Sequence, residues 1–498
     1  MWRGRMAGGG RAQAAPDAAY DRAIFLMLDG ARGDLFADLL RAGELPQVAR
    51  HIVEPGAHAT ATTVFPSVTG VAYAPYLTGC FPQRTNLTGV RWLDRKKYAR
   101  RNLSASRFRS YAGLGHYMWD RDLSADVRTL FELVRPSSNI FGTISRGTGL
   151  HRNSFYLRRV PWALKFHLTG DWAPIDERSN THLYRAAGRP RERFTFHTTL
   201  QIDEHSHHDG PFSPRVREGY RRFDQMVGEL ARRLSDKGRL ERTLLVLGSD
   251  HGHGEVHAHF DLAAWVAARG LATLSYPKAF GRRWFSSEAA VMVGGNGMGQ
   301  IYLRGAGWAA DESGEERLAH APGLVDDLLA EPAVDLCAWG RADRAVEVRS
   351  RRGAATVRLF DDSVEYRVHG SDPFGYGPLP ERLDRRAALK ETQETNYPDG
   401  LVQVAQLFGA ARTGDLVISA ARGYDLGGDA GRRSFRSGHG SLHRDHMAVP
   451  VAMNHRFDTT AVRTVDLCPS ILTLLGEPVL PRLDGESLIT QRRPLPSS

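Results

Sequence analysis

Short apolar runs alternate with longer amphipathic segments in this chain, and this alternation limits the folds open to it. The clearest runs are Ala23 to Leu28, Ile140 to Ile144, Phe194 to Ile202, Thr243 to Leu247 and Val449 to Met453. Between them, Arg215 to Leu234 repeats apolar residues at helical spacing, with Tyr220 and Phe223 on one face. Strands that alternate with helices favour an α/β fold in which helices sandwich a mostly parallel sheet.

Acidic and histidine residues stand where these runs end. Asp29 follows the first run, Asp203 and His207 lie at the end of the third, and Asp250 and His251 follow the fourth. His439 lies shortly before the last run. Ligands of such sheets collect at the carboxyl ends of the strands. Three carboxylates and three imidazoles can hold two divalent ions such as zinc, and a pair of metal ions favours transfer of a phosphoryl-like group.

Several motifs occur in an order that resembles the alkaline phosphatase superfamily, and most closely its nucleotide pyrophosphatase/phosphodiesterase branch. The motifs are Asp29-Gly30, Thr69 nine residues before Thr78-Gly79, Asp203-x-x-x-His207, Ser249-Asp250-His251-Gly252 and Gly438-His439-Gly440. None of them is specific alone, but their order is strong evidence. In that branch a threonine at the position of Thr69 is the nucleophile.

The resemblance implies a ligand set and a mechanism. Asp29, Asp250, His251 and the Thr69 oxygen would surround one ion, and Asp203, His207 and His439 would hold the other, with zinc expected at both. The reaction would then pass through a covalent phosphothreonine. Thr69 is also expected to open a helix, whose N–H groups and dipole would favour a bound phosphate.

One departure leaves the substrate open. The phosphodiesterase branch contacts a phosphate oxygen through an asparagine, whereas Gly70-Val71-Ala72 after Thr69 supplies no side-chain donor. Arg91 and Asn296 are candidates for this role. The sequence therefore leaves several functions open. They are hydrolysis of a phosphodiester or nucleotide pyrophosphate, a phosphomonoesterase, a phosphomutase, and a binding protein without catalytic activity on the same scaffold.

Two further features compete with this interpretation. Cys80-Phe81-Pro82-Gln83-Arg84 matches the Cys-x-Pro-x-Arg pattern of sulfatases, which would make Cys80 the catalytic residue, although a small buried side chain fits this position better. His253, His257 and His259 follow the Asp-His-Gly motif, and we interpret them as surface residues or as residues behind the ligands.

Composition and charge restrict the partners and the compartment. Cys80, Cys337 and Cys468 are too few for a disulfide framework, and neither a signal-like leader nor a membrane-spanning segment is evident, so we expect a cytoplasmic protein. The formal net charge of +10 favours a small anionic phosphoryl substrate. The basic run Arg91 to Arg101 is interpreted as a solvated loop, so a nucleic-acid partner is not expected. The oligomeric state stays open.

The chain length and the breaks in the pattern predict the domain organisation. Residues 1 to 20 are expected to be a disordered lead-in. Residues 21 to 304 and 426 to 498 would form the catalytic domain, with residues 90 to 190 looping over the site. Residues 305 to 425 would form an inserted α+β cap subdomain, in which the runs Ala345 to Val348, Ala355 to Phe360 and Val364 to Val368 predict an antiparallel meander.

Overall fold

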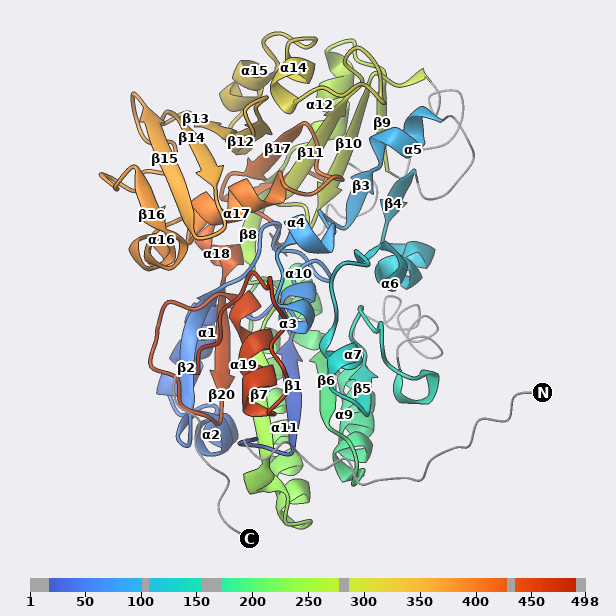
Figure 1. Ribbon diagram of the computed structural model, residues 1–498, viewed down its shortest axis with the longest axis vertical. Helices are drawn as coiled ribbons and strands as arrows, with labels where there is room; N and C mark the ends of the chain where they lie inside the picture. Colours follow the sequence, from blue (N-terminus) through green and yellow to red (C-terminus); the bar gives the residue numbers. More distant parts are fainter. Residues whose placement is uncertain (1–17, 101–106, 155–171, 277–285, 428–434, 490–498) are drawn as a thin grey trace, which may run out of the picture.

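The structure is a computed structural model that describes residues 18–100, 107–154, 172–276, 286–427 and 435–489 (Figure 1). Most of the predicted lead-in lies outside these ranges. Ala18 and Ala19 are described and buried, and the backbone N–H of Ala19 donates to the carbonyl oxygen of Leu474 at 2.9 Å. Among the described residues, no helix is both long enough and apolar enough to cross a membrane.

A six-stranded sheet forms the lower half of the molecule in Figure 1, in the order β2-β20-β7-β1-β6-β5. Its strands are β1 (Arg22–Leu28), β2 (Ala57–Thr62), β5 (Ser137–Ile140), β6 (Phe194–Thr199), β7 (Thr243–Gly248) and β20 (Ala448–Met453). β1 pairs in parallel with both β6 and β7, and β5 pairs in parallel with β6. β20 runs antiparallel to both of its neighbours, β2 and β7, so it is the one strand of this sheet with the reverse direction. The predicted mostly parallel sheet is confirmed.

Two of the predicted strands were placed too far along the chain. The run predicted from Ile140 to Ile144 is a strand only up to Ile140, because Phe141 adopts a φ of 62° that does not fit a strand. The run predicted from Phe194 to Ile202 ends at Thr199, and a helix begins at Gln201. The apolar residues beyond each strand are buried by other contacts, so hydrophobicity alone did not mark the strand end.

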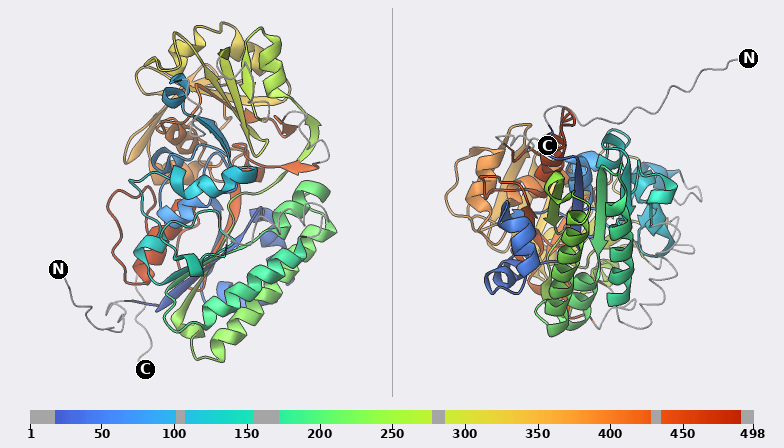
Figure 2. Two further views of the ribbon diagram at one scale, coloured as in Figure 1. Left: turned by 90° about the vertical axis from the view of Figure 1, so that its right-hand side faces the viewer. Right: turned by 90° about the horizontal axis from the view of Figure 1, so that it is seen from below.

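Helices cover both faces of this sheet, as predicted. In β1, Leu26 packs into a core with α1 (Gly33–Arg41), α9 (Ala173–Gly188) and α11 (Pro214–Ser235), and the last two lie side by side in Figure 2. Phe25 points to the opposite core, formed with α3 (Ala74–Thr78), α7 (Leu130–Leu133) and α19 (Leu467–Leu474). Alternate strand residues face opposite sides, so each face gains roughly 1.5–3 kcal/mol for every large apolar side chain it buries.

A second, nine-stranded sheet forms the upper half, in the order β16-β15-β14-β13-β12-β17-β11-β10-β9. Its strands are β9 (Thr273–Ser275), β10 (Ala289–Gly294), β11 (Met298–Leu303), β12 (Val334–Gly340), β13 (Val346–Ser350), β14 (Ala354–Leu359), β15 (Ser363–His369), β16 (Arg382–Asp384) and β17 (Leu416–Ala420). β13, β14 and β15 pair antiparallel, which confirms the meander. The sheet already begins at β9, and the domain division at residue 305 stays a prediction.

Residues 90 to 190 are more regular than predicted. They contain β5 of the main sheet and α9 beside it, as well as a hairpin of β3 (Arg91–Leu93) and β4 (Phe108–Ser110). The prediction of loops was wrong for α9 and for the hairpin, because α9 is only weakly amphipathic and the two hairpin strands are three residues long. The remaining helices and strands are α2 (Pro46–Val48), α4 (Pro82–Thr85), α5 (Arg95–Ala99), α6 (Trp119–Asp122), α10 (Gln201–Asp209), β8 (Gly254–His259), α12 (Leu262–Ala268), α14 (Gly314–Leu318), α15 (Leu324–Ala330), α16 (Arg385–Thr392), α17 (Gly400–Leu407), β18 (Gly423–Asp425), β19 (Ser437–Gly438) and α18 (Arg444–Met447).

Candidate metal and nucleophile centre

Two of the predicted acids lie where two neighbouring parallel strands end. Asp29 directly follows β1 and Asp250 follows β7, whose last residue, Gly248, lies opposite Met27. The backbone N–H of Gly30 donates to Oδ1 of Asp250 at 3.1 Å, which ties the two strand ends together. Both carboxylates are buried, with at most 1% of either residue exposed.

Asp203 and His207 belong to a helix rather than to a strand end. Asp203 lies in the first turn of α10, and His207 lies one turn later on the same face, with Nε2 3.7 Å from Oδ1 of Asp203. α10 approaches β1 closely at Gly30, where a Cβ would lie 2.7 Å from Cα of Asp203. Gly30 also has a φ of 74°, which other residues rarely adopt, so a glycine is required here.

His439 joins the same cluster from a distant part of the sequence. It follows β19, and its backbone forms an isolated bridge with Asn296. Its ring stacks on the ring of His251 with the centroids 3.6 Å apart and the planes 8° apart. The structure therefore brings together all six predicted acids and histidines in one buried cluster.

Thr69 lies at the edge of this cluster and is the one predicted site residue that is only partly buried. Its Oγ1 is 3.0 Å from Nε2 of His251 and 3.4 Å from Oδ1 of Asp29. The expectation that Thr69 opens a helix was wrong. α3 begins at Ala74, because Gly70 has a φ of 86° that no α-helix accommodates.

The backbone fixes which nitrogen of each histidine faces the cluster. Nδ1 of His207, His251 and His439 lies 3.0 to 3.1 Å from the carbonyl oxygens of Ser437, Gly252 and Ser67, respectively. A carbonyl oxygen only accepts hydrogen bonds, so each Nδ1 carries the proton and each Nε2 presents a lone pair. This is the arrangement in which outer hydrogen bonds orient imidazole ligands toward a metal ion.

Burial makes the cluster costly for its own charges. Burial, and then the nearby charge of Asp203, raise the pKa of Asp250 to about 8, while burial lowers the pKa of His251 to about 3. Burial also lowers the pKa of His439 well below its usual range. The imidazoles of His251 and His439 are therefore neutral. Oδ2 of Asp250 is buried and accepts no hydrogen bond from any described residue.

The donor set fits divalent metal ions. One ligand atom from each of Asp29, Asp250 and His251 lies within 4.8 Å of the others, and the same holds for Asp203, His251 and His439 and for Asp203, His207 and His253. Carboxylate oxygens and imidazole nitrogens are the ligands that zinc and similar ions prefer. The set expected for the second ion, Asp203 with His207 and His439, is not among these groups in the described part of the chain.

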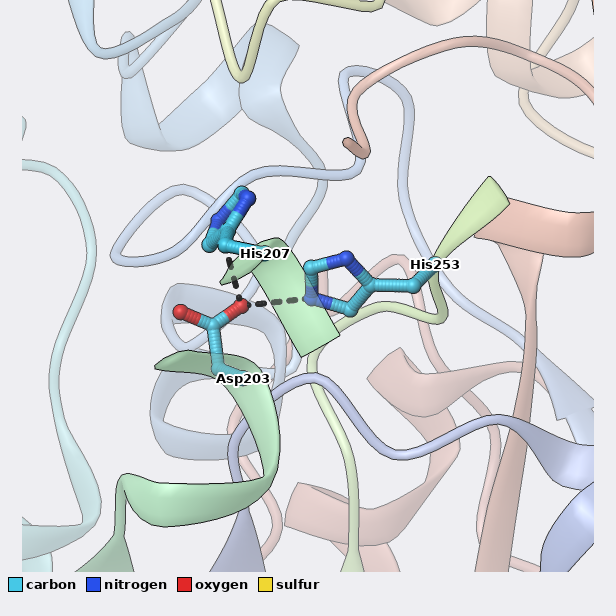
Figure 3. Close-up of side chains that lie close together, drawn as sticks. All are labelled: Asp203, His207 and His253. Atoms are coloured by element: carbon cyan, nitrogen blue, oxygen red, sulfur yellow. Dashed lines mark hydrogen bonds and ion pairs between the residues drawn. The ribbon is translucent and has the colours of Figure 1, made fainter. Parts of the chain in front are cut away.

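His253, which the sequence analysis interpreted as a surface residue or as a residue behind the ligands, lies inside the cluster (Figure 3). It is fully buried, with Nε2 2.7 Å from Oδ1 of Asp203 and Nδ1 3.0 Å from Oγ of Ser437. Ser437 gives its hydroxyl proton to the carbonyl oxygen of Ser206 at 2.6 Å, so Nδ1 of His253 carries a proton and Nε2 has a lone pair. Two acceptor atoms 2.7 Å apart require a proton or a metal ion between them.

Tyr73 is a second residue that sequence reasoning missed. Its buried hydroxyl donates to Oδ2 of Asp29 at 2.5 Å and thereby fixes the carboxylate that faces Thr69. Tyr73 lies four residues after Thr69, but the backbone between them is a series of turns, so no helical spacing pointed to it.

The remaining candidates lie elsewhere. Cys80 is buried, its Sγ donates to the carbonyl oxygen of Thr78, and burial raises the pKa of its thiol to about 12, as expected for a packing residue. His257 and His259 are exposed on β8, as interpreted. Nη1 of Arg91 donates to the carbonyl oxygen of Val293 at 3.1 Å. Asn296 directs its side chain toward Gly427, where a Cβ would lie 3.1 Å from Oδ1.

Comparison with known proteins agrees with this geometry. Residues 23–446 match the sequence model of the family described as type I phosphodiesterase / nucleotide pyrophosphatase. No curated protein matches the chain.

Several solved structures share the fold. Murine ectonucleotide pyrophosphatase / phosphodiesterase 5 is 13% identical, with a TM-score of 0.55 over 92% of this chain and 96% of its own. Its inactive variant in complex with AMP is also 13% identical, with a TM-score of 0.55 over 93% and 96%. Phosphonoacetate hydrolase from Sinorhizobium meliloti 1021, in complex with phosphonoformate, is 16% identical, with a TM-score of 0.54 over 95% and 100%.

Proposed function

Because the chain belongs to the type I phosphodiesterase / nucleotide pyrophosphatase family, and is therefore a phosphoryl-hydrolysing enzyme, we propose that it works with two divalent ions and Thr69 as its nucleophile. The observation that carries the proposal is the position of Thr69. Thr69 is partly buried, and its hydroxyl oxygen lies 3.0 Å from Nε2 of His251, at the edge of the buried acids and histidines.

The proposed ligands follow the clusters. Asp29, Asp250 and His251 would hold one ion beside Thr69. Asp203 would hold the other ion, together with histidine ligands drawn from the set His207, His439 and His253. Bound divalent ions of this kind, zinc in our proposal, lower the pKa of a nucleophilic hydroxyl and stabilise a leaving oxygen.

The residues around Thr69 determine the course of the proposed reaction. After the hydroxyl of Thr69 has lost its proton to solvent, Oγ1 forms a bond to phosphorus as the bond from phosphorus to the leaving oxygen breaks. Water then hydrolyses the phosphothreonine, which releases the phosphoryl product and returns a proton to Oγ1. Tyr73 holds Asp29 through its hydroxyl, and the carbonyl oxygens of Ser437, Gly252 and Ser67 keep the imidazole lone pairs directed inward.

We propose a small phosphodiester or nucleotide pyrophosphate as the substrate and the cytoplasm as the compartment. A structural neighbour binds AMP, and the net charge of +10 favours an anion. The three cysteines are buried free thiols, which fits a reducing compartment.

The test is a parallel assay of bis-nitrophenyl phosphate, nitrophenyl phosphate and nitrophenyl sulfate with the parent protein and with Thr69→Ala. The proposal expects diester turnover that is highest of the three and is lost in the variant. Dominant sulfate turnover that survives in Thr69→Ala and is lost in Cys80→Ala would replace it with a sulfatase. Dominant monoester turnover would support the phosphomonoesterase alternative.

A further inference from the structure

We propose that the indole N–H of Trp119 is the donor to a phosphoryl oxygen at Thr69, in place of the asparagine that the phosphodiesterase branch uses. This inference rests on the proposed function and adds to it a residue that contacts the substrate. It begins from a gap in the site: Gly70, Val71 and Ala72 have no side-chain donor, and Arg91 and Asn296 are directed to other partners.

The ring of Trp119 lies directly against the nucleophile turn. A Cβ on Gly70, the residue after Thr69, would lie 2.4 Å from Cζ2, 2.5 Å from Cη2 and 2.8 Å from Cε2 of the indole. Nε1 is bonded to Cε2, so the N–H is one bond away from an atom that lies against Gly70. Two features therefore require a glycine at position 70: its φ of 86°, and the indole ring that occupies the space of a side chain.

In the described part of the chain, the N–H of this indole has no acceptor. Trp119 is 2% exposed, and its Nε1 is buried without a hydrogen-bond partner among the described residues. Buried tryptophans normally pair this group, because leaving it unpaired costs about 1–3 kcal/mol. A buried donor without a partner beside a nucleophile is what an oxyanion site requires, since a preorganised donor in a water-poor site stabilises developing charge most strongly.

The surroundings hold the indole in place. Its ring stacks on Tyr111 with the centroids 3.5 Å apart and the planes 17° apart. The Tyr111 hydroxyl donates to Asp122 at 3.1 Å and accepts from Nε1 of Trp92 at 3.2 Å, and Asp122 also accepts from Nε of Arg109 at 2.6 Å. Trp119 and Asp122 are the ends of α6, so this network fixes the position of the ring. A ring that only filled space would not need such anchoring.

The decisive variant is Trp119→Phe, which keeps an aromatic ring and removes the N–H. Its matched control is Trp265→Phe on α12, which removes an indole N–H that donates to Oε1 of Glu331 at 2.7 Å, outside the network that holds Trp119. We would measure kcat and KM for bis-nitrophenyl phosphate, the inhibition constant of vanadate, and the metal content. We expect Trp119→Phe to lower kcat about a hundredfold and to weaken vanadate binding by a similar factor, with unchanged metal content.

A second variant guards against a folding artefact. Gly70→Ala places a methyl group where the indole lies, so it should also lower kcat and weaken vanadate binding, with the metal retained. If Trp119→Phe keeps kcat and the vanadate constant within about twofold of the parent, the N–H does not contact the phosphoryl group and the inference is wrong. The same holds if Trp265→Phe loses as much as Trp119→Phe. A parent without diester turnover would instead contradict the proposed function.

Discussion

Replacing Tyr73 with phenylalanine should weaken the metal set that contains Asp29 without altering the fold. The Tyr73 hydroxyl donates to Oδ2 of Asp29 at 2.5 Å, and phenylalanine removes that one atom from a buried position. A hydrogen bond to a charged group contributes about 1.5–3 kcal/mol. Since about 1.4 kcal/mol corresponds to a factor of ten in affinity, the metal at this set should bind roughly 10 to 100 times more weakly.

The assay is a zinc titration of the metal-free protein against a competing chelator, which resolves two binding steps of different affinity. We expect one step to weaken in Tyr73→Phe and the other to stay unchanged. The matched control is Tyr366→Phe, because the Tyr366 hydroxyl donates to the Asp372 carboxylate in the other sheet, away from the cluster. If Tyr73→Phe remains folded and binds both ions like the parent, the hydrogen bond does not support a metal ligand and the argument fails.

Further predictions concern the nucleophile, His253 and pH. Thr69→Ala should abolish diester turnover while retaining metal, whereas Cys80→Ala, at a buried packing position, should keep turnover. The reverse pattern in a diester assay would show that Thr69 is not the nucleophile. His253→Phe should weaken metal binding at Asp203 by roughly 10 to 100 times, whereas His257→Phe, at an exposed position, is the control. If a chelator titration gives the same metal affinity for both variants, this prediction is wrong. In the metal-free protein the pKa of Asp250 is raised to about 8, so its proton must leave before metal binds. Zinc affinity should therefore rise about tenfold per pH unit from pH 6 toward pH 8 and then level off. A zinc affinity that calorimetry finds constant over this pH range would contradict the prediction.

The sequence predicted the main sheet because its strands are locally apolar and end in polar residues. β1, β7 and β20 lie within about a residue of their predicted ranges, and Asp29 and Asp250 follow their strands as expected. Asp203 was assigned to a strand end because Phe194 to Ile202 is a continuous apolar and polar mixture, and only the structure distinguishes the end of β6 from the start of α10.

Contacts between distant residues could not be predicted in the same way. His253 directly precedes β8 and meets Asp203 across fifty positions, because β19 pairs with β8 and packs against α10. No local pattern separates it from the exposed His257 and His259. Trp119 reaches Gly70 because the segment after β4 folds back over the nucleophile turn. Such contacts depend on tertiary packing, whereas the order of the motifs that contain the proposed metal ligands can be read directly from the sequence.

The number of metal ions in an active preparation tests the central claim most directly. We would purify the protein without chelators and measure metal and protein by mass spectrometry of the elements, together with diester turnover on the same sample. The clusters around Asp29 and Asp203 predict about two divalent ions per chain in the active protein. A fully active preparation with one ion or fewer per chain would contradict the two-metal account.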